Sequence, residues 1–141
     1  MRTTNSTSTP AASSVAFAIA LTVAGVVSAR AHHSFAAEFD ITKPVTLVGN
    51  VTKIEWTNPH AFLFIDVKDP QTGAVTNWEI EMGSPNGLTR LGWTRTLLKP
   101  GDGITVEGSL ARNKANLANA RSVVMTATGR KLGAASSESA Q

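Results

Sequence analysis

Three histidines, His32, His33 and His60, are the residues of this chain best suited to bind a metal ion. The first two follow residues 29–31 (Ala-Arg-Ala), which have the small-x-small pattern that signal peptidase recognises. Cleavage before His32 would give this residue a free α-amine beside its imidazole. These two groups form a bidentate chelate, which with a second imidazole from His33 or His60 suits the tetragonal nitrogen preference of Cu(II). The sequence therefore predicts a candidate copper site at these three histidines.

The same histidines also allow an interpretation without metal. Adjacent histidines near a chain terminus commonly bind nothing specific, and His60 could instead hold the turn from Trp56 to His60 through a backbone hydrogen bond. The copper hypothesis resembles the N-terminal histidine brace of secreted copper proteins only in the positions of the histidines, and the fold expected here differs from theirs. Met82 and Met125, which could bind Cu(I), fall on inward strand faces and are expected in the core.

A second group of candidate residues is acidic. Glu79 and Glu81 alternate with apolar residues along one expected strand, and Asp66 lies on the preceding strand. Two carboxylates on one strand face can perform acid–base chemistry when a cleft gives them different pKa values. This alternation is more typical of a solvated strand face. Because the chain also has no cysteine and none of the common hydrolase, zinc-protease or phosphate-loop motifs, we expect no enzymatic activity and no catalytic residues.

Nucleic-acid binding is a third hypothesis. Trp56, Trp78 and Trp93 could stack bases beside basic side chains, as exposed aromatic residues do in many OB-folds. However, the mature chain would lose Arg2 and Arg30 of its 13 basic residues, which leaves 11 against 10 acidic ones and a net charge of +1. Core or turn packing suits each tryptophan better, and Trp93 is expected to be the most exposed of them. We therefore expect no nucleic-acid partner.

The first 31 residues differ from the rest of the chain. They start with Met1-Arg2 and contain an uncharged apolar run at 15–27, which is shorter than the roughly 20 residues of a membrane-spanning helix. The Ala-Arg-Ala pattern follows this run at once, so residues 1–31 are interpreted as a signal peptide. An uncleaved membrane anchor is the alternative. The sequence thus predicts a periplasmic or secreted protein without stable membrane insertion after cleavage.

The mature chain contains short segments rich in Val, Ile, Phe and Thr between turn signals, which is typical of an all-β protein. The expected strands cover 45–56, 60–68, 74–82, 104–110 and 121–128. Leu47 and Val51 share one parity along the first strand, whereas Ile54 and Trp56 share the other. This change predicts a bulge or bend, which Gly49 could accommodate, and a long bent strand can belong to two sheets.

A short helix is expected between the third and fourth strands. Ser84 can act as its N-cap, Pro85 suits the first helical position, and Gly92 can end it. The order of three strands, one helix and two strands is that of the OB-fold, a five-stranded Greek-key barrel. The predicted fold class is therefore an all-β, five-stranded OB-fold-like barrel. Another small β-sandwich or barrel is the alternative, because one sequence does not give the order of strands in space.

Three segments make up the expected domain organisation. Residues 1–31 are the signal peptide, and residues 32–131 form the OB-like domain with an N-terminal arm. Residues 132–141 are expected to be a disordered tail, because the sequence from Gly133 onward is small and polar.

Four motifs together give a resemblance to a known family. They are His-His-Ser-Phe at 32–35, Trp-Thr-Asn-Pro-His at 56–60, Gly-Ser-Pro-Asn at 83–86 and Leu-Lys-Pro-Gly-Asp at 98–102. In this combination the chain resembles a family of small secreted bacterial proteins catalogued as a domain of unknown function, over about residues 32–132. The resemblance implies an exported, single-domain β protein and brings no activity with it.

We therefore expect an exported, non-enzymatic binding module that binds copper or another transition metal through His32, with His33 or His60. The alternative is a metal-free accessory domain that docks an envelope protein or a small ligand. These two hypotheses differ in whether the free amine at His32 and the imidazole of His60 can share one ion.

Overall fold

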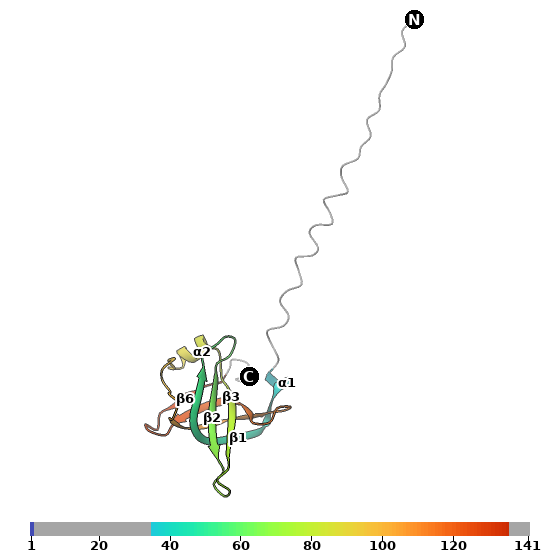
Figure 1. The fold of residues 1–141 in the computed structure, drawn as a ribbon. Helices are drawn as coiled ribbons and strands as arrows, with labels where there is room; N and C mark the ends of the chain where they lie inside the picture. The colour runs from blue at the N-terminus through green and yellow to red at the C-terminus, as the bar shows by residue number, and fades with distance from the viewer. Residues whose placement is uncertain (2–34, 136–141) are drawn as a thin grey trace. The chain divides into compact units, whose positions relative to one another are not determined.

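A computed structural model of the chain describes Met1 and residues 35–135. The chain divides into two units, Met1–Ala31 and His32–Gln141, and the helices and strands of the described residues belong to the second. In chain order (Figure 1) these are α1 (Phe35–Glu38), β1 (Phe39–Glu55), β2 (Phe62–Lys68), β3 (Val75–Glu81), α2 (Pro85–Arg90), β4 (Gly103–Ala111), β5 (Leu117–Met125) and β6 (Lys131–Gly133).

Five of the strands form a closed ring. β1 pairs with β2 and β4, β2 also pairs with β3, and β4 also pairs with β5, all antiparallel. The ring is closed by the parallel pairing of β3 with β5, which we call the β3–β5 seam and which consists of Glu79↔Leu117, Ile80↔Ala118 and Glu81↔Asn119. With α2 between β3 and β4, the predicted all-β, five-stranded OB-fold-like class is confirmed.

The first strand bends, as its change of parity predicts. Asn50 is paired on both sides, so β1 changes partner there from β4 to β2. The register with β2 shifts between Val51 and Lys53, which marks a bulge. A Cβ on Gly49 would lie only 2.4 Å from the backbone oxygen of Asp66. Glycine therefore allows the two backbones to approach closely where β1 joins the second half of the ring.

The hairpin between β2 and β3 is fixed by its turn residues. Asp69 Oδ1 accepts hydrogen bonds from the backbone N–H groups of Gln71 and Thr72, both at 2.8 Å. Both hydrogen bonds lower the pKa of Asp69, and the one from Thr72 has the larger effect. Gly73 has a φ of +73°, a conformation that glycine adopts without strain. The turn thus sets the register that runs from Lys68↔Val75 to Phe62↔Glu81.

The core lies inside the ring. Its fully buried side chains include those predicted on inward faces, such as Ile80 and Met82, and Met125 packs against it while partly buried. Trp56 and Trp78 also pack against the core from partly buried positions. Trp93 is only 3% exposed and donates a hydrogen bond from Nε1 to the Gly133 carbonyl at 2.7 Å. The expectation that Trp93 is the most exposed of the three is therefore wrong, because Trp93 is buried and bonded to the backbone of β6.

Two strands begin earlier than the sequence predicts. β5 starts at Leu117 rather than 121, and Leu117 to Ala120 are all buried, although their small and polar residues are typical of a loop. They are buried because β5 pairs with β4 on one side and β3 on the other. β1 starts at Phe39, which is 1% exposed, rather than at 45.

The folded region also continues beyond the predicted end at residue 131. β6 pairs with the end of β5, and Leu132 and Ala134 are buried. Lys131 Nζ lies 2.8 Å from Glu107 Oε2, and this hydrogen bond, followed by one from Ser122, lowers the pKa of Glu107. The expectation of a disordered tail from residue 132 is therefore wrong for residues 132–134, because apolar burial and strand pairing fix them.

The close approach at Gly49 gives a prediction about stability. Gly49→Ala places a methyl group against the Asp66 carbonyl, so we expect a loss of about 1–3 kcal/mol in the free energy of unfolding. Gly133→Ala is the control, because its Cβ would meet Leu91 at an ordinary 3.5 Å. Urea denaturation followed by tryptophan fluorescence measures both, and equal stability of the two variants would contradict the role given to Gly49.

Candidate functional site

His60 is paired with a buried carboxylate. Its Nδ1 lies 2.9 Å from Glu81 Oε1, and the exposed fractions of the two side chains are 29% and 9%. Asn119 Nδ2 lies 3.5 Å from the same oxygen, at the long limit of a hydrogen bond. Within residues 35–135, Nε2 of His60 makes no hydrogen bond. One ring nitrogen is therefore held by the protein, while the ring as a whole keeps some access to solvent.

The β2–β3 ladder brings these two residues together. Phe62 is the register partner of Glu81. Because His60 precedes Phe62 by two residues, His60 and Glu81 form a diagonal pair on one face of the ladder. Ala61 extends the ladder, since its N–H donates to Gly83 and its carbonyl accepts from Met82. On the other side, Thr57 Oγ1 donates to the His60 carbonyl at 3.0 Å. The turn therefore uses the Thr57 hydroxyl, not the His60 imidazole, as its hydrogen-bond donor.

Glu81 lies on the outer face of the β3–β5 seam. Ile80 and Ala118 point into the core, so Glu79 and Glu81 on β3, and Leu117 and Asn119 on β5, lie on the opposite face.

The expected acidic stripe does not form one exposed group. Glu81 is only 7% exposed, which corrects the expectation that it is solvated, because His60 and β5 cover it. Glu79 instead pairs with Lys114. Asp66 accepts from Asn77 Nδ2 at 2.7 Å, at the far end of the β2–β3 ladder from Glu81.

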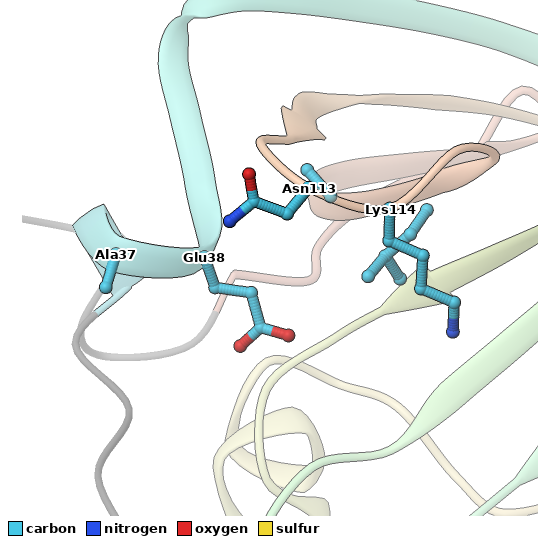
Figure 2. A pocket seen from close by; sticks show the side chains of 6 residues that line it. Ala37, Glu38, Asn113 and Lys114 are labelled. Atoms are coloured by element: carbon cyan, nitrogen blue, oxygen red, sulfur yellow. The ribbon is translucent and has the colours of Figure 1, made fainter.

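The N-terminal arm lines a pocket that one residue of the seam also lines. A pocket separates α1 from the β4–β5 loop, and Leu117 contributes to its lining. Figure 2 shows Ala37 and Glu38 of α1 on one side of this pocket and Asn113 and Lys114 on the other. Leu117 precedes Asn119 by two residues on the same face of β5, so the pocket and the Asn119–Glu81 contact involve nearby residues of the seam.

Arg112 and Asp40 fix the position of the arm. The Arg112 backbone N–H donates to the Glu38 carbonyl at 2.8 Å, and Nε donates to the Ala36 carbonyl at 2.9 Å. Its Nη1 lies 3.2 Å from Asp40 Oδ2. The other Asp40 oxygen accepts from the hydroxyl and the N–H of Thr42, at 2.7 and 3.1 Å. The start of the folded chain is therefore held against β4 and the loop that follows it.

The comparison with family models agrees with the motifs in the sequence. The model of the family of unknown function DUF6152 matches residues 20–119, which is more than half of the chain. The chain belongs to this family. No curated protein and no solved structure gives a significant match.

In this DUF6152 protein, only one of the three candidate metal ligands lies within the described residues. His60 is placed as described above, whereas His32 and His33 lie outside the described residues. Among the residues that the structure describes, no three His, Asp or Glu side chains gather as they would around a metal ion. In the same part of the chain, no helix is long and apolar enough to cross a membrane. A group of three such side chains that includes His60 would therefore need at least one residue outside the described part of the chain.

Three residues of this region were not singled out by sequence reasoning for the roles they have. Its alternation along the strand predicts that Glu81 is solvated, and Arg112 and Asn119 fall between the expected strands 104–110 and 121–128. The register of the β2–β3 hairpin is the signal that could have placed Glu81 beside His60, because Lys68↔Val75 fixes every later pair. No comparable local signal exists for Asn119 or Arg112, because their contacts depend on pairing between segments far apart in sequence.

The contacts of Asp40 predict a pH dependence of stability. The pKa of Asp40 is held below its ordinary value of 3.8. The largest cause is the hydrogen bond from the Thr42 hydroxyl, and the next is the one from the Thr42 backbone N–H. The positive charges of Arg112 and Lys43 lower the pKa further. A lowered pKa stabilises the folded protein above the ordinary value, and this contribution is lost as the pH falls through the folded-state pKa. We expect Asp40→Asn to be less stable than the wild type at neutral pH, with a difference that shrinks below pH 3.8.

Urea denaturation of both proteins from neutral pH to about pH 2.5 measures this difference. The control is Thr42→Val, made in the wild type and in Asp40→Asn. It should destabilise the wild type more, because the variant has already lost the charged acceptor. A difference that stays constant over the whole pH range would contradict the assignment.

Proposed function

We propose that the mature chain is an exported, non-enzymatic binding module that holds a transition metal, copper in the first place, between His32 and His60. His33 is the alternative source of the second imidazole. The observation that carries this proposal is the 2.9 Å contact between His60 Nδ1 and Oε1 of the buried Glu81 carboxylate. Histidines that bind metals almost always donate their other ring N–H to a carboxylate, a carbonyl or water, which fixes the ring and raises its basicity.

Export is supported by the first 31 residues. Their positive start, short apolar run and Ala-Arg-Ala pattern are those of a signal peptide. The boundary between the two units of the chain, Ala31 to His32, falls at the expected cleavage site. The proposed location is therefore the periplasm or the exterior of the cell, with a new N-terminus at His32.

The position of the arm supports a shared site. Ala37 lines a pocket with Leu117, and Asn119 lies two residues further along β5, about 7 Å away. Of the five steps of chain from Ala37 back to His32, two lie in α1 and rise about 1.5 Å each, and the three before Phe35 span at most about 10 Å when extended. A shared site requires the His60 ring to lie within this reach of Ala37.

The available donors favour copper. An amine and two imidazoles give three nitrogen ligands, which suit the tetragonal geometry of Cu(II). The chain has no cysteine, so no thiolate competes for a softer ion. Met82, the thioether nearest to the site along the chain, is fully buried in the core.

Copper binding by the mature protein tests this proposal. We expect a 1:1 complex with the Cu(II) EPR spectrum of nitrogen ligands when the protein is exported by its own signal and begins at His32. One extra residue before His32 should abolish this spectrum, because it converts the amine to an amide. His60→Ala should weaken binding at least about tenfold, as loss of a ligand-fixing contact already does.

The same residue added after Gln141 is the matched control and should change nothing. His33→Ala decides which second imidazole is used. If the protein with an authentic His32 terminus takes up no stoichiometric copper or other transition metal, the proposal fails. Retention of that metal-free protein on an envelope protein would then favour the accessory-domain alternative.

A further inference from the structure

We infer that Glu81 is the positioning residue of this site: its carboxylate keeps hydrogen on Nδ1 of His60 and so makes Nε2 the atom that binds a divalent transition metal. The inference rests on the proposed function for the metal itself. The tautomer, however, is a property of the metal-free protein and can be measured without any ligand.

The contact between the two side chains favours one position of the imidazole hydrogen. Glu81 Oε1 lies 2.9 Å from His60 Nδ1. An ionised carboxylate oxygen carries lone pairs and no hydrogen, so at this distance it favours an N–H over a lone pair on Nδ1. A neutral imidazole carries one hydrogen, which leaves the lone pair on Nε2. Free histidine has no such partner, and its ring can carry the hydrogen on either nitrogen.

The backbone around Glu81 keeps the carboxylate in place. Glu81 is paired with Phe62 of β2 on one side and with Asn119 of β5 on the other. Its side chain is 9% exposed, and Asn119 Nδ2 lies 3.5 Å from the oxygen that accepts from His60. Gly108 of β4 allows the backbone of β5 to approach closely at Asn119, because a Cβ at Gly108 would lie 2.0 Å from the Asn119 carbonyl oxygen. The acceptor is thus built into the seam.

The backbone around His60 is fixed equally well. Ala61 is bonded to Met82 at 2.9 Å and to Gly83 at 3.1 Å, and the His60 carbonyl accepts from Thr57. A flip of the ring would place a carbon atom where Nδ1 now faces the buried carboxylate, which is unfavourable. The folded protein therefore favours one orientation and one tautomer of His60 before any metal arrives.

Glu79 provides a natural comparison two residues earlier on the same face. Its carboxylate pairs with Lys114 and its side chain is 28% exposed. A structural role on the seam is therefore open to both glutamates, whereas only Glu81 contacts the His60 ring among the pairs described. Matched substitutions of the two residues separate positioning of the imidazole from general support of the seam.

The first experiment measures the ring nitrogens by NMR in mature, metal-free protein labelled with 15N-histidine, above the histidine pKa. We expect the wild type to carry hydrogen on Nδ1 of His60. Glu81→Met keeps the length of the side chain without an acceptor, and should shift His60 toward the other tautomer. Glu79→Met should leave the spectrum of His60 unchanged. Hydrogen on Nε2 in the wild type would overturn the inference.

The second experiment measures Cu(II) affinity of the same proteins with the authentic His32 terminus. Glu81→Met should weaken binding about 10- to 100-fold, as loss of such a partner does elsewhere. Glu81→Gln keeps an acceptor oxygen without the charge, so it should keep the tautomer and lose less affinity. Glu81→Gln is the milder substitution, and it tests the role of Glu81 if Glu81→Met does not fold. Glu79→Met should bind like the wild type.

The two proposals fail in different ways. If the wild type binds copper and both Glu81 variants bind it equally well, the positioning role of Glu81 is wrong while the metal site stands. If the wild type binds no transition metal, the proposed function falls and the metal role of Glu81 falls with it. If His60 of that protein still carries its hydrogen on Nδ1, the contact between His60 and Glu81 contributes to the fold alone.

Discussion

The parallel pairing of β3 with β5 is the contact on which the other features of the molecule depend. Three residue pairs close the ring, and without them the antiparallel strands would form an open sheet with two long edges. The same pairs place apolar residues inward and Glu81 and Asn119 outward. His60 contacts Glu81 on the outer side of this closure, and Leu117 of the same pairing lines the pocket beside the arm. Fold and candidate site therefore share one short segment of backbone pairing.

Much of the fold could be predicted from local pattern, because each strand and turn has its own signal. The parity change along β1 predicts the bulge, and Ser84 and Pro85 predict α2, whose first turn Ser84 does cap. The pattern fails where burial comes from partners far away in sequence. Leu117 to Ala120 are typical of a loop until β3 and β4 enclose them, and Trp93 is exposed until residues 132–134 cover it.

The candidate site was predictable only in part for the same reason. His60 stands out because of its residue type and its place before a strand, so sequence alone singles it out. Glu81 does not, because alternation places it on the outer face but says nothing about what covers that face. Its burial beside His60 requires the register of one hairpin and the closure of the ring together. Neither condition is a property of the segment that contains Glu81.

The turn at residues 69–74 has a consequence for how this family can vary. Its hydrogen bonds from Gln71 and Thr72 to Asp69 set the register of β2 against β3 all the way to Phe62 and Glu81. A slip of one residue would exchange the two faces of a strand, so Ile80 would leave the core and Glu81 would enter it. Insertions or deletions at this exposed turn should therefore be rarer than exposure alone would suggest. Selection on its length would act through residues at the opposite end of the hairpin.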